Sequence, residues 1–196
     1  MQPARKPGRP LSFDREAALH SAMLLFWRHG YEATSLTDLT AAMGIGPPSL
    51  YAAFGDKKSL FRAAVQRYVS GPVTSASLIA TAPSARAAAR SLLQAAAVGF
   101  TGADTPPGCL LATGAISCSA AAADVQGELA AIRRDIEAAL QGRLAADGLP
   151  QAEALAAHVM AVIQGMSTLA RDGASRDRLM AVAEIALAGW PDGQIT

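Results

Sequence analysis

The chain has 196 residues, of which 51% are apolar and 17% charged, and its formal net charge is +1. This length can bury a substantial core, as one domain or as two small ones. No segment offers the roughly eighteen uninterrupted apolar residues of a membrane span, and no apolar run follows the first basic residues as in a signal peptide. Cys109 and Cys118 are too few for a disulfide framework and lack metal-finger spacing. We therefore expect a soluble, cytoplasmic protein with no membrane partner, no metal site and no cofactor.

The small net charge conceals an uneven distribution along the chain. Residues 1–70 hold nine Lys and Arg against five Asp and Glu, whereas residues 71–196 hold eight against eleven. A basic part can neutralise nucleic-acid phosphates, and an acidic part has no such task. The distribution predicts a DNA-binding domain followed by a domain with a different role.

The first four predicted elements are helices. Residues 1–11 are rich in proline and arginine, so we expect a basic arm that is disordered without DNA. A helix is predicted over 14–29, ended by Gly30. A second begins after Ser35, a good N-cap with Asp38 three residues later, and ends at Gly44. A third begins at Pro47 and Pro48, where the missing N–H is not needed, and a fourth covers 57–70.

The remaining chain also has helical patterns, and no strand pattern competes with them. A domain boundary is predicted at 71–84, followed by a weakly amphipathic helix over 84–100 and a break at 102–108. An apolar segment, 109–123, precedes the last three predicted helices, which cover 124–147, 150–171 and 175–189. The chain is therefore predicted to be all-α.

Only residues 44–46 separate the second and third helices, so these helices must cross steeply, and the third is free to enter a DNA groove. The segment from about 12 to 68 resembles the DNA-binding domain of TetR-type transcriptional repressors. The motifs that carry the resemblance are Gly30-Tyr31, Thr34-Ser35, Gly44-Ile45, Ser49-Leu50-Tyr51-Ala52-Ala53-Phe54 and Asp56-Lys57. The resemblance implies an N-terminal three-helix helix-turn-helix DNA-binding domain over 12–70. It also implies a C-terminal helical ligand-binding and dimerisation domain over 71–196.

The resemblance implies a set of DNA-binding residues. Hydroxyls and a lysine at helix N-termini suit phosphate oxygens. The residues assigned to DNA are Thr34, Ser35, Thr37, Ser49, Tyr51 and Lys57. Capping is an equal alternative for Ser35, and core packing is an alternative for Tyr51. Pro47 and Pro48 offer no donor to a base edge, which leaves apolar contact with thymine methyl groups.

The basic arm becomes more important because few side chains of the third helix can hydrogen-bond to base edges. Its sequence Arg5-Lys6-Pro7-Gly8-Arg9-Pro10 resembles arginine arms that lie in the minor groove, whose potential is most negative over narrow A·T-rich tracts. Arg9 is the residue that we expect to insert. A basic terminus that is simply solvated is the alternative.

In the family the region after the DNA-binding domain houses an inducer pocket. Residues 91–123 contain one charged residue, Asp104, so we expect a small, mostly uncharged ligand. The residues predicted to line the pocket are Phe100, Cys109, Leu110, Leu111, Thr113 and Ile116. Cys109, in a Gly-Cys-Leu setting, is either a small buried hydrophobe or a thiol that senses electrophiles or oxidants.

The last two predicted helices resemble the family's dimerisation pair, and His158 on them is interpreted as a core or interface residue. An enzyme is not expected, because His20, His29 and His158 are scattered and the apolar region lacks titratable partners. The sequence thus predicts a homodimeric repressor that a small, largely apolar ligand releases from a palindromic double-stranded operator. The alternatives are a thiol sensor acting through Cys109 and a constitutive architectural DNA-binding protein.

Overall fold

A computed structural model describes residues 13–116 and 118–190, and within these ranges the regular structure is entirely helical. The all-α prediction is therefore confirmed. The predicted arm over 1–11, with Arg9, lies outside the described residues. The elements are α1 (Arg15–Ala33), α2 (Leu36–Met43), α3 (Pro47–Phe54), α4 (Lys57–Val69), α5 (Ser75–Thr81), α6 (Ala85–Gly99), α7 (Leu110–Thr113), η1 (Ala120–Ala122), α8 (Ala123–Ala146), α9 (Ala152–Arg171) and α10 (Arg176–Ala188).

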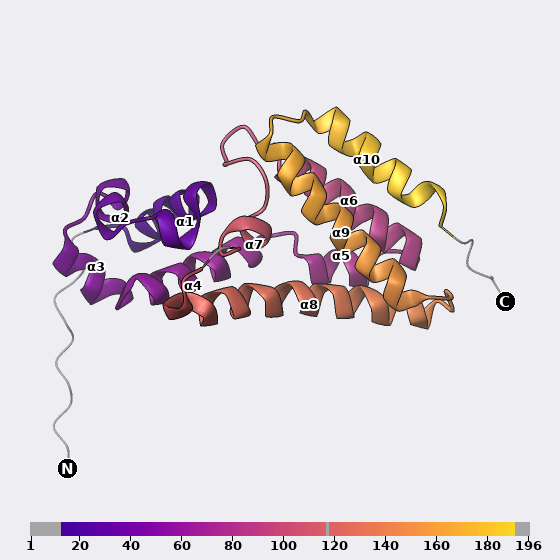
Figure 1. Ribbon diagram of the computed structural model, residues 1–196, viewed down its shortest axis with the longest axis horizontal. Coiled ribbons are helices and arrows are strands. Elements are labelled where there is room, and N and C mark those ends of the chain that lie inside the picture. Colours follow the sequence, from indigo (N-terminus) through magenta and orange to yellow (C-terminus); the bar gives the residue numbers. More distant parts are fainter. Residues whose placement is uncertain (1–12, 117, 191–196) are drawn as a thin grey trace, which may run out of the picture.

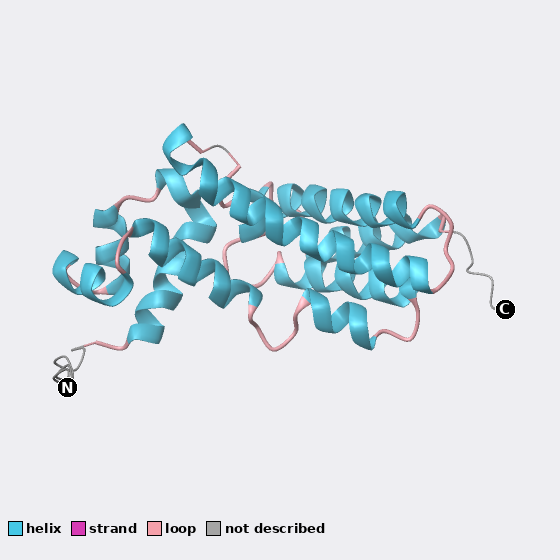
Figure 2. Ribbon diagram, turned by 90° about the horizontal axis from the view of Figure 1, so that it is seen from below, coloured by secondary structure: helices cyan, strands magenta, loops and turns pink. Residues whose placement is uncertain are grey.

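The molecule is elongated, with α1, α2 and α3 gathered at one end and α9 and α10 towards the other (Figure 1). The long helix α8 runs beneath both groups, and α7 lies between them. The view from below shows the same division of the helices into two groups (Figure 2).

Local capping explains why the two short helices begin and end where they do. The Ser35 hydroxyl accepts the Asp38 N–H at 3.1 Å and the Asp38 carboxylate accepts the Ser35 N–H at 3.0 Å, which is a capping box. Gly44 ends α2 in the left-handed conformation, with φ of 66°, a region that glycine enters without steric cost. Gly46 then leads into Pro47 and Pro48 in the first turn of α3. The predicted helix-turn-helix is confirmed.

Aromatic packing holds this end of the molecule together. The rings of Phe26 and Phe61 meet edge to face with centroids 5.0 Å apart, and Tyr31 packs on Phe61 at 5.1 Å. Leu39 from α2 and Leu50 from α3 are fully buried in the same core. The short helices are thus fixed by α1 and α4 through burial of apolar surface, because helices of eight residues are marginal by themselves.

The predicted end of the first helix at Gly30 is confirmed as a break, where φ is 80° and ψ is 173°, although α1 resumes beyond it as far as Ala33. The predicted boundary over 71–84 contains α5, which a Thr74–Ser77 capping box begins. Two predictions about the helices were wrong in detail. α9 starts at Ala152, after the left-handed residue Gln151, rather than at Pro150.

The second error concerns α6, which is strongly amphipathic rather than weakly so. Its buried positions follow helical spacing along the whole element: Ala85, Ala88, Ala89, Leu92, Leu93, Ala96 and Ala97. Most of these residues are alanines, so the helix lies close to its neighbours α5, α9 and α10.

Candidate nucleic-acid interface and ligand pocket

The helix α3 presents three of the predicted residues to solvent at the end of the molecule. Pro47 and Pro48 are exposed in its first turn, and the Tyr51 side chain is 49% exposed one turn later. Leu50 and Phe54 lie on the opposite side and are buried. Core packing of Tyr51 is therefore excluded, and Ser49 is half-buried at the edge of the exposed face.

The three hydroxyls before and within α2 have different surroundings. Thr34 is 1% exposed and its hydroxyl donates to the Gly30 carbonyl at 2.6 Å, so the predicted phosphate contact does not fit this side chain. Ser35 is exposed but its hydroxyl donates to Asp38 at 2.6 Å as part of the capping box. Thr37 is exposed in the first turn of α2, where helix N–H groups favour anions.

Lys57 begins α4 and is positioned by α1. Its ammonium lies 4.5 Å from the centre of the Tyr31 ring and 3.4 Å from the Glu32 carbonyl oxygen. Burial lowers the pKa of Lys57, and Glu32 opposes that shift. The cation–π contact holds the charge at the surface beside α2 and α3.

Arg15 is a basic residue on this surface that the sequence interpretation did not single out. Its guanidinium lies 4.7 Å from the centre of the Phe54 ring, which places the charge next to α3. Arg15 is far from the helix-turn-helix motif in sequence, so only the packing of α1 on α3 reveals it.

Much of the remaining basic excess is neutralised within the chain. Lys58 pairs with Asp124 at 2.9 Å, and the Arg62 guanidinium donates to Glu128 at 3.0 Å. These ion pairs join α4 to the start of α8. The charge asymmetry of the sequence thus serves partly to dock the two groups of helices and only partly to attract DNA.

A cavity of about 370 Å³ lies between α4, α5, α6, α8 and α9. Phe100, Cys109 and Leu111, which the sequence assigns to the ligand pocket, line this cavity. The other assigned residues lie outside its lining: Leu110 is fully buried in the core, the Thr113 hydroxyl is bonded to the Cys109 carbonyl, and Ile116 is 59% exposed on the surface. The volume lies within the range of small-molecule pockets.

The polar groups of the cavity come mostly from outside residues 91–123. The Tyr68 hydroxyl of α4 donates to the Cys109 thiol sulfur at 3.4 Å, and burial raises the pKa of Tyr68 well above its usual value. Arg133 of α8 and Gln164 of α9 also line the wall. The sequence interpretation missed Arg133, because the sequence of α8 does not show which face of that helix lines a cavity.

The segment 108–114, part of which lines the cavity, is also hydrogen-bonded to α1. The Trp27 indole donates to the Gly108 carbonyl at 3.0 Å, and the Tyr31 N–H donates to the Gly114 carbonyl at 2.7 Å. Arg171 of α9 donates to the Trp27 carbonyl at 2.7 Å.

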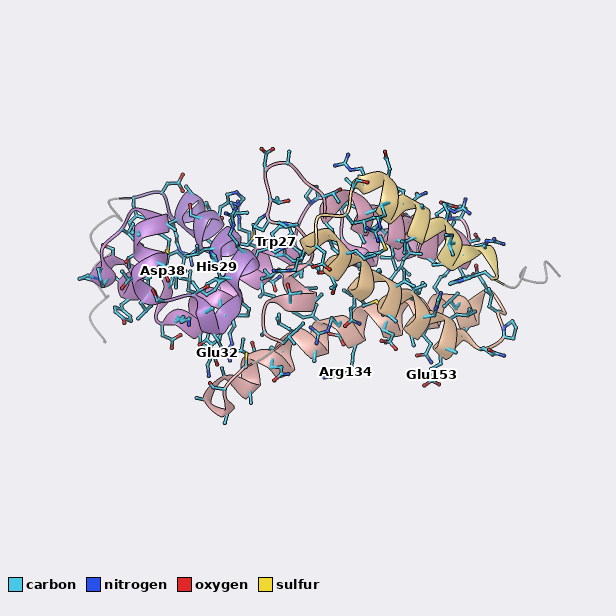
Figure 3. The ribbon with its side chains drawn as sticks, turned by 45° about the horizontal axis from the view of Figure 1, so that its top comes forward. Trp27, His29, Glu32, Asp38, Arg134 and Glu153 are labelled. Atoms are coloured by element: carbon cyan, nitrogen blue, oxygen red, sulfur yellow. The ribbon has the colours of Figure 1, made fainter. Side chains whose placement is uncertain are left out.

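Glu32 accepts the Ser119 N–H at 2.8 Å, and hydrogen bonds from Ser119 lower the pKa of Glu32. Figure 3 places Glu32 at the edge that faces the start of α8.

The outer face of α9 and α10 carries an apolar groove. Its lining residues are Leu155, His158, Val162, Val182, Ile185, Ala186, Gly189 and Trp190. Ile185 is 75% exposed, which is unusual for a large aliphatic side chain in a continuous apolar face. His158 lines this groove, and its interpretation as a core or interface residue stays a prediction.

The described part of the chain contains no cluster of three or more His, Cys, Asp or Glu that could hold a metal ion. No helix among the described residues is long and apolar enough to cross a membrane.

Comparison with known proteins connects this geometry to a family. The family model for bacterial regulatory proteins of the tetR family matches residues 18–64, which run from within α1 to within α4. The HTH-type transcriptional repressor ComR of Escherichia coli K12 is 40% identical over 94% of this chain and 92% of its own length. The repressor BdcR of the same organism is 30% identical over 93% of this chain and 92% of its own.

A solved structure covers the fold almost completely. It is a cysteine-substituted mutant of the TetR family regulator CifR in complex with a 26-base-pair double-stranded operator DNA. It is 38% identical to this chain, covers 94% of this chain and 100% of its own, and superimposes with a TM-score of 0.86. These three relatives are transcriptional regulators.

Proposed function

Because this chain belongs to the TetR family of bacterial regulatory proteins, we propose that it is a transcriptional repressor released from its operator by a small molecule. The repressor activity of ComR and BdcR and the operator complex of CifR support the proposal. The protein acts in the cytoplasm and catalyses no reaction. Residues 12–70 form its DNA-binding domain and residues 71–196 its ligand-binding and dimerisation domain.

The exposed face of α3 is the observation that carries the DNA-binding role. Pro47, Pro48 and Tyr51 contact base edges or the adjoining sugars, with apolar contact to thymine methyl groups as the main form of readout. Phosphates lie against helix N-termini around this face. The residues that hold them are Ser35, Thr37, Ser49 and Lys57, with Arg15 as an addition from α1. The arm with Arg9 supplies a minor-groove contact.

Dimerisation uses the apolar groove of α9 and α10. A second copy related by a two-fold axis would cover Ile185 and Val182 with the same face of its own helices. Two recognition helices related by that axis meet two inverted half-sites, whose centres lie about one helical turn or a multiple of it apart.

Footprinting on the upstream region of the protein's own gene tests the operator. We expect two protected half-sites related by inversion and a dimer by sedimentation. Protection of one asymmetric half-site by a monomer would refute the proposal, and similar affinity for unrelated sequences would favour the architectural alternative. Ile185→Glu should give monomers and lose most operator affinity. Ile116→Glu is its matched control, because Ile116 is exposed outside the groove.

Release by ligand rests on the cavity between α4 and α9. A ligand acts as inducer only when it prefers the conformation whose recognition helices no longer match the half-sites, since equal affinity for both conformations shifts nothing. Residues 108–114 contribute cavity wall at Cys109, Leu111 and Ala112 and hold α1 through Gly108 and Gly114. They offer a direct path from the cavity to the DNA-binding domain.

Thiol sensing is the second candidate, and the position of Cys109 favours it. An electrophile that enters the cavity meets the thiol, which lines the wall beside the Tyr68 hydroxyl. Cys109→Ser separates the two modes: under reversible binding the variant still releases DNA with ligand, whereas under thiol sensing it stays bound when mild oxidant or electrophile releases the wild type. Cys118→Ser is the control. The operator complex of cysteine-substituted CifR supports the expectation that the serine variant still binds DNA.

A further inference from the structure

Arg133 is a cation in the wall of an otherwise mostly apolar cavity. Its Nη1 donates to the Leu111 carbonyl, and among the described residues no carboxylate lies within ion-pair distance of its guanidinium. Two other arginines of the body form ion pairs: Arg143 contacts Asp147 at 3.0 Å and Arg90 contacts Glu184 at 3.6 Å. Arg133 instead lines the cavity with a neutral acceptor and, among the described residues, without a counter-ion.

The chemistry of a guanidinium predicts what would complete this site. It carries five N–H donors in a planar fork, and the Leu111 carbonyl uses only part of that capacity. Two parallel hydrogen bonds to one carboxylate match the fork, and charge-assisted bonds are about twice as strong as neutral ones. The mostly apolar lining strengthens such a pair, because charges attract more strongly where the effective dielectric is below that of water.

We propose that the cavity binds a small organic acid whose carboxylate pairs with Arg133 and whose apolar part lies against Leu92, Phe100 and Ile163. This inference rests on the proposed function and specifies its ligand. The expectation of an uncharged ligand counted charges within residues 91–123 only, whereas Arg133 enters the wall from α8. A largely apolar molecule with one carboxylate satisfies both the lining and the cation.

The same contact connects the ligand to DNA release. A carboxylate that takes the fork containing Nη1 competes with the Leu111 carbonyl for that nitrogen, although the other donors of the guanidinium are spare. Leu111 belongs to α7, and Gly114, directly after α7, accepts the Tyr31 N–H of α1 at 2.7 Å. Loss of the Arg133 bond loosens the segment that holds α1, so the acid favours the conformation without operator affinity.

The test uses two pairs of probes that share a carbon skeleton and differ in whether it ends in a carboxylate or in an uncharged hydroxyl: octanoate against 1-octanol, and 4-phenylbutyrate against 4-phenylbutan-1-ol. Calorimetry measures their binding to the full-length dimer, and fluorescence anisotropy measures operator release. For wild type we expect the dissociation constant of each acid to be lower than that of its alcohol by a factor of about ten or more, which is the gain from one charge-assisted hydrogen bond. The acids should also release the operator at lower concentration.

Variants at neighbouring positions of α8 identify the residue responsible. Arg133→Met keeps the length of the side chain, removes its charge, and should abolish the preference for the acid. Arg133→Lys should retain part of it. Arg134→Met is the matched control and should behave as wild type, because Arg134 is exposed and projects from the outer side of α8 (Figure 3).

Each outcome decides between the two proposals. Equal binding of acid and alcohol, or an acid preference that survives Arg133→Met, overturns the carboxylate site and leaves ligand release intact. Failure of all four probes to bind overturns the carboxylate site and also counts against the cavity as a ligand site. A circular dichroism spectrum and a melting temperature for each variant exclude misfolding as the cause of a lost preference.

Discussion

Gly30→Ala is the perturbation that best tests how the DNA-binding domain is held to the body. Gly30 has φ of 80° and ψ of 173°, a region that only glycine adopts readily. A Cβ at this position would lie 3.2 Å from the Gly114 carbonyl oxygen, which is the acceptor of the Tyr31 N–H. The substitution therefore strains α1 and pushes on the bond that joins α1 to the segment after α7.

Two terms set the magnitude. Backbone strain in this region costs about 1–3 kcal/mol, and a weakened hydrogen bond to a buried N–H costs about 1 kcal/mol or more. We expect the free energy of unfolding to fall by about 2–4 kcal/mol. In a chain of this size that loss lowers the melting temperature by about 4–16 °C, since each kcal/mol shifts it by about 2–4 °C.

Denaturant unfolding followed by circular dichroism measures the loss, with two glycine controls. Gly44→Ala also places alanine at positive φ, but its Cβ meets nothing within 4 Å, so about 1 kcal/mol of strain is expected. Gly142 is exposed near the C-terminal end of α8 with nothing within 4 Å of a Cβ, so Gly142→Ala should stabilise by about 0.5–1 kcal/mol. If Gly30→Ala costs no more than Gly44→Ala, the contact with Gly114 has no energetic role.

Three further predictions concern the DNA-binding surface and its attachment. Lys57→Ala should weaken binding to all sequences equally and reduce the salt slope of the affinity by about one unit, measured by anisotropy at several salt concentrations. Tyr51→Ala should cost about 1–3 kcal/mol on the operator and less on random DNA. The bond to Lys58 lowers the pKa of Asp124, so Asp124→Asn should lose stability at pH 7. That deficit should shrink in unfolding measurements as the pH falls below about 4, the ordinary pKa of an aspartate in the unfolded chain, and should vanish only below the lowered pKa of the folded Asp124.

The helix-turn-helix could be predicted from sequence because its signals are local. Ser35, Asp38, Gly44 and the two prolines each act within one helical turn, and all were found where the capping and turn rules place them. α5 was missed because its capping box uses Ser77, instead of the usual Glu or Gln, inside a stretch with loop-like composition. α6 was underrated because alanine contributes little to an apolar pattern even where it is fully buried.

The candidate sites were less predictable, because each depends on which helices meet. Thr34 has the sequence position of a phosphate-binding hydroxyl, but the break at Gly30 turns it inward, where its hydroxyl bonds the Gly30 carbonyl. Ile116 is apolar and lies in the apolar segment, yet it projects to solvent beyond α7. Residue type and neighbourhood in sequence are alike for Leu111 and Ile116, and only the tertiary packing separates a pocket wall from the surface.

The pocket and the DNA-binding domain share a short piece of chain, and this limits how the protein can respond to a ligand. Residues 108–114 touch the cavity through Cys109 and Leu111, and α1 through the carbonyls of Gly108 and Gly114. A shift of less than 1 Å in this segment breaks hydrogen bonds to α1, because such bonds weaken steeply with distance and angle. A ligand therefore need not reorganise the whole bundle. It has only to favour a different position of α7, and a carboxylate that withdraws Arg133 from Leu111 meets that requirement with a single exchange of hydrogen-bond partners.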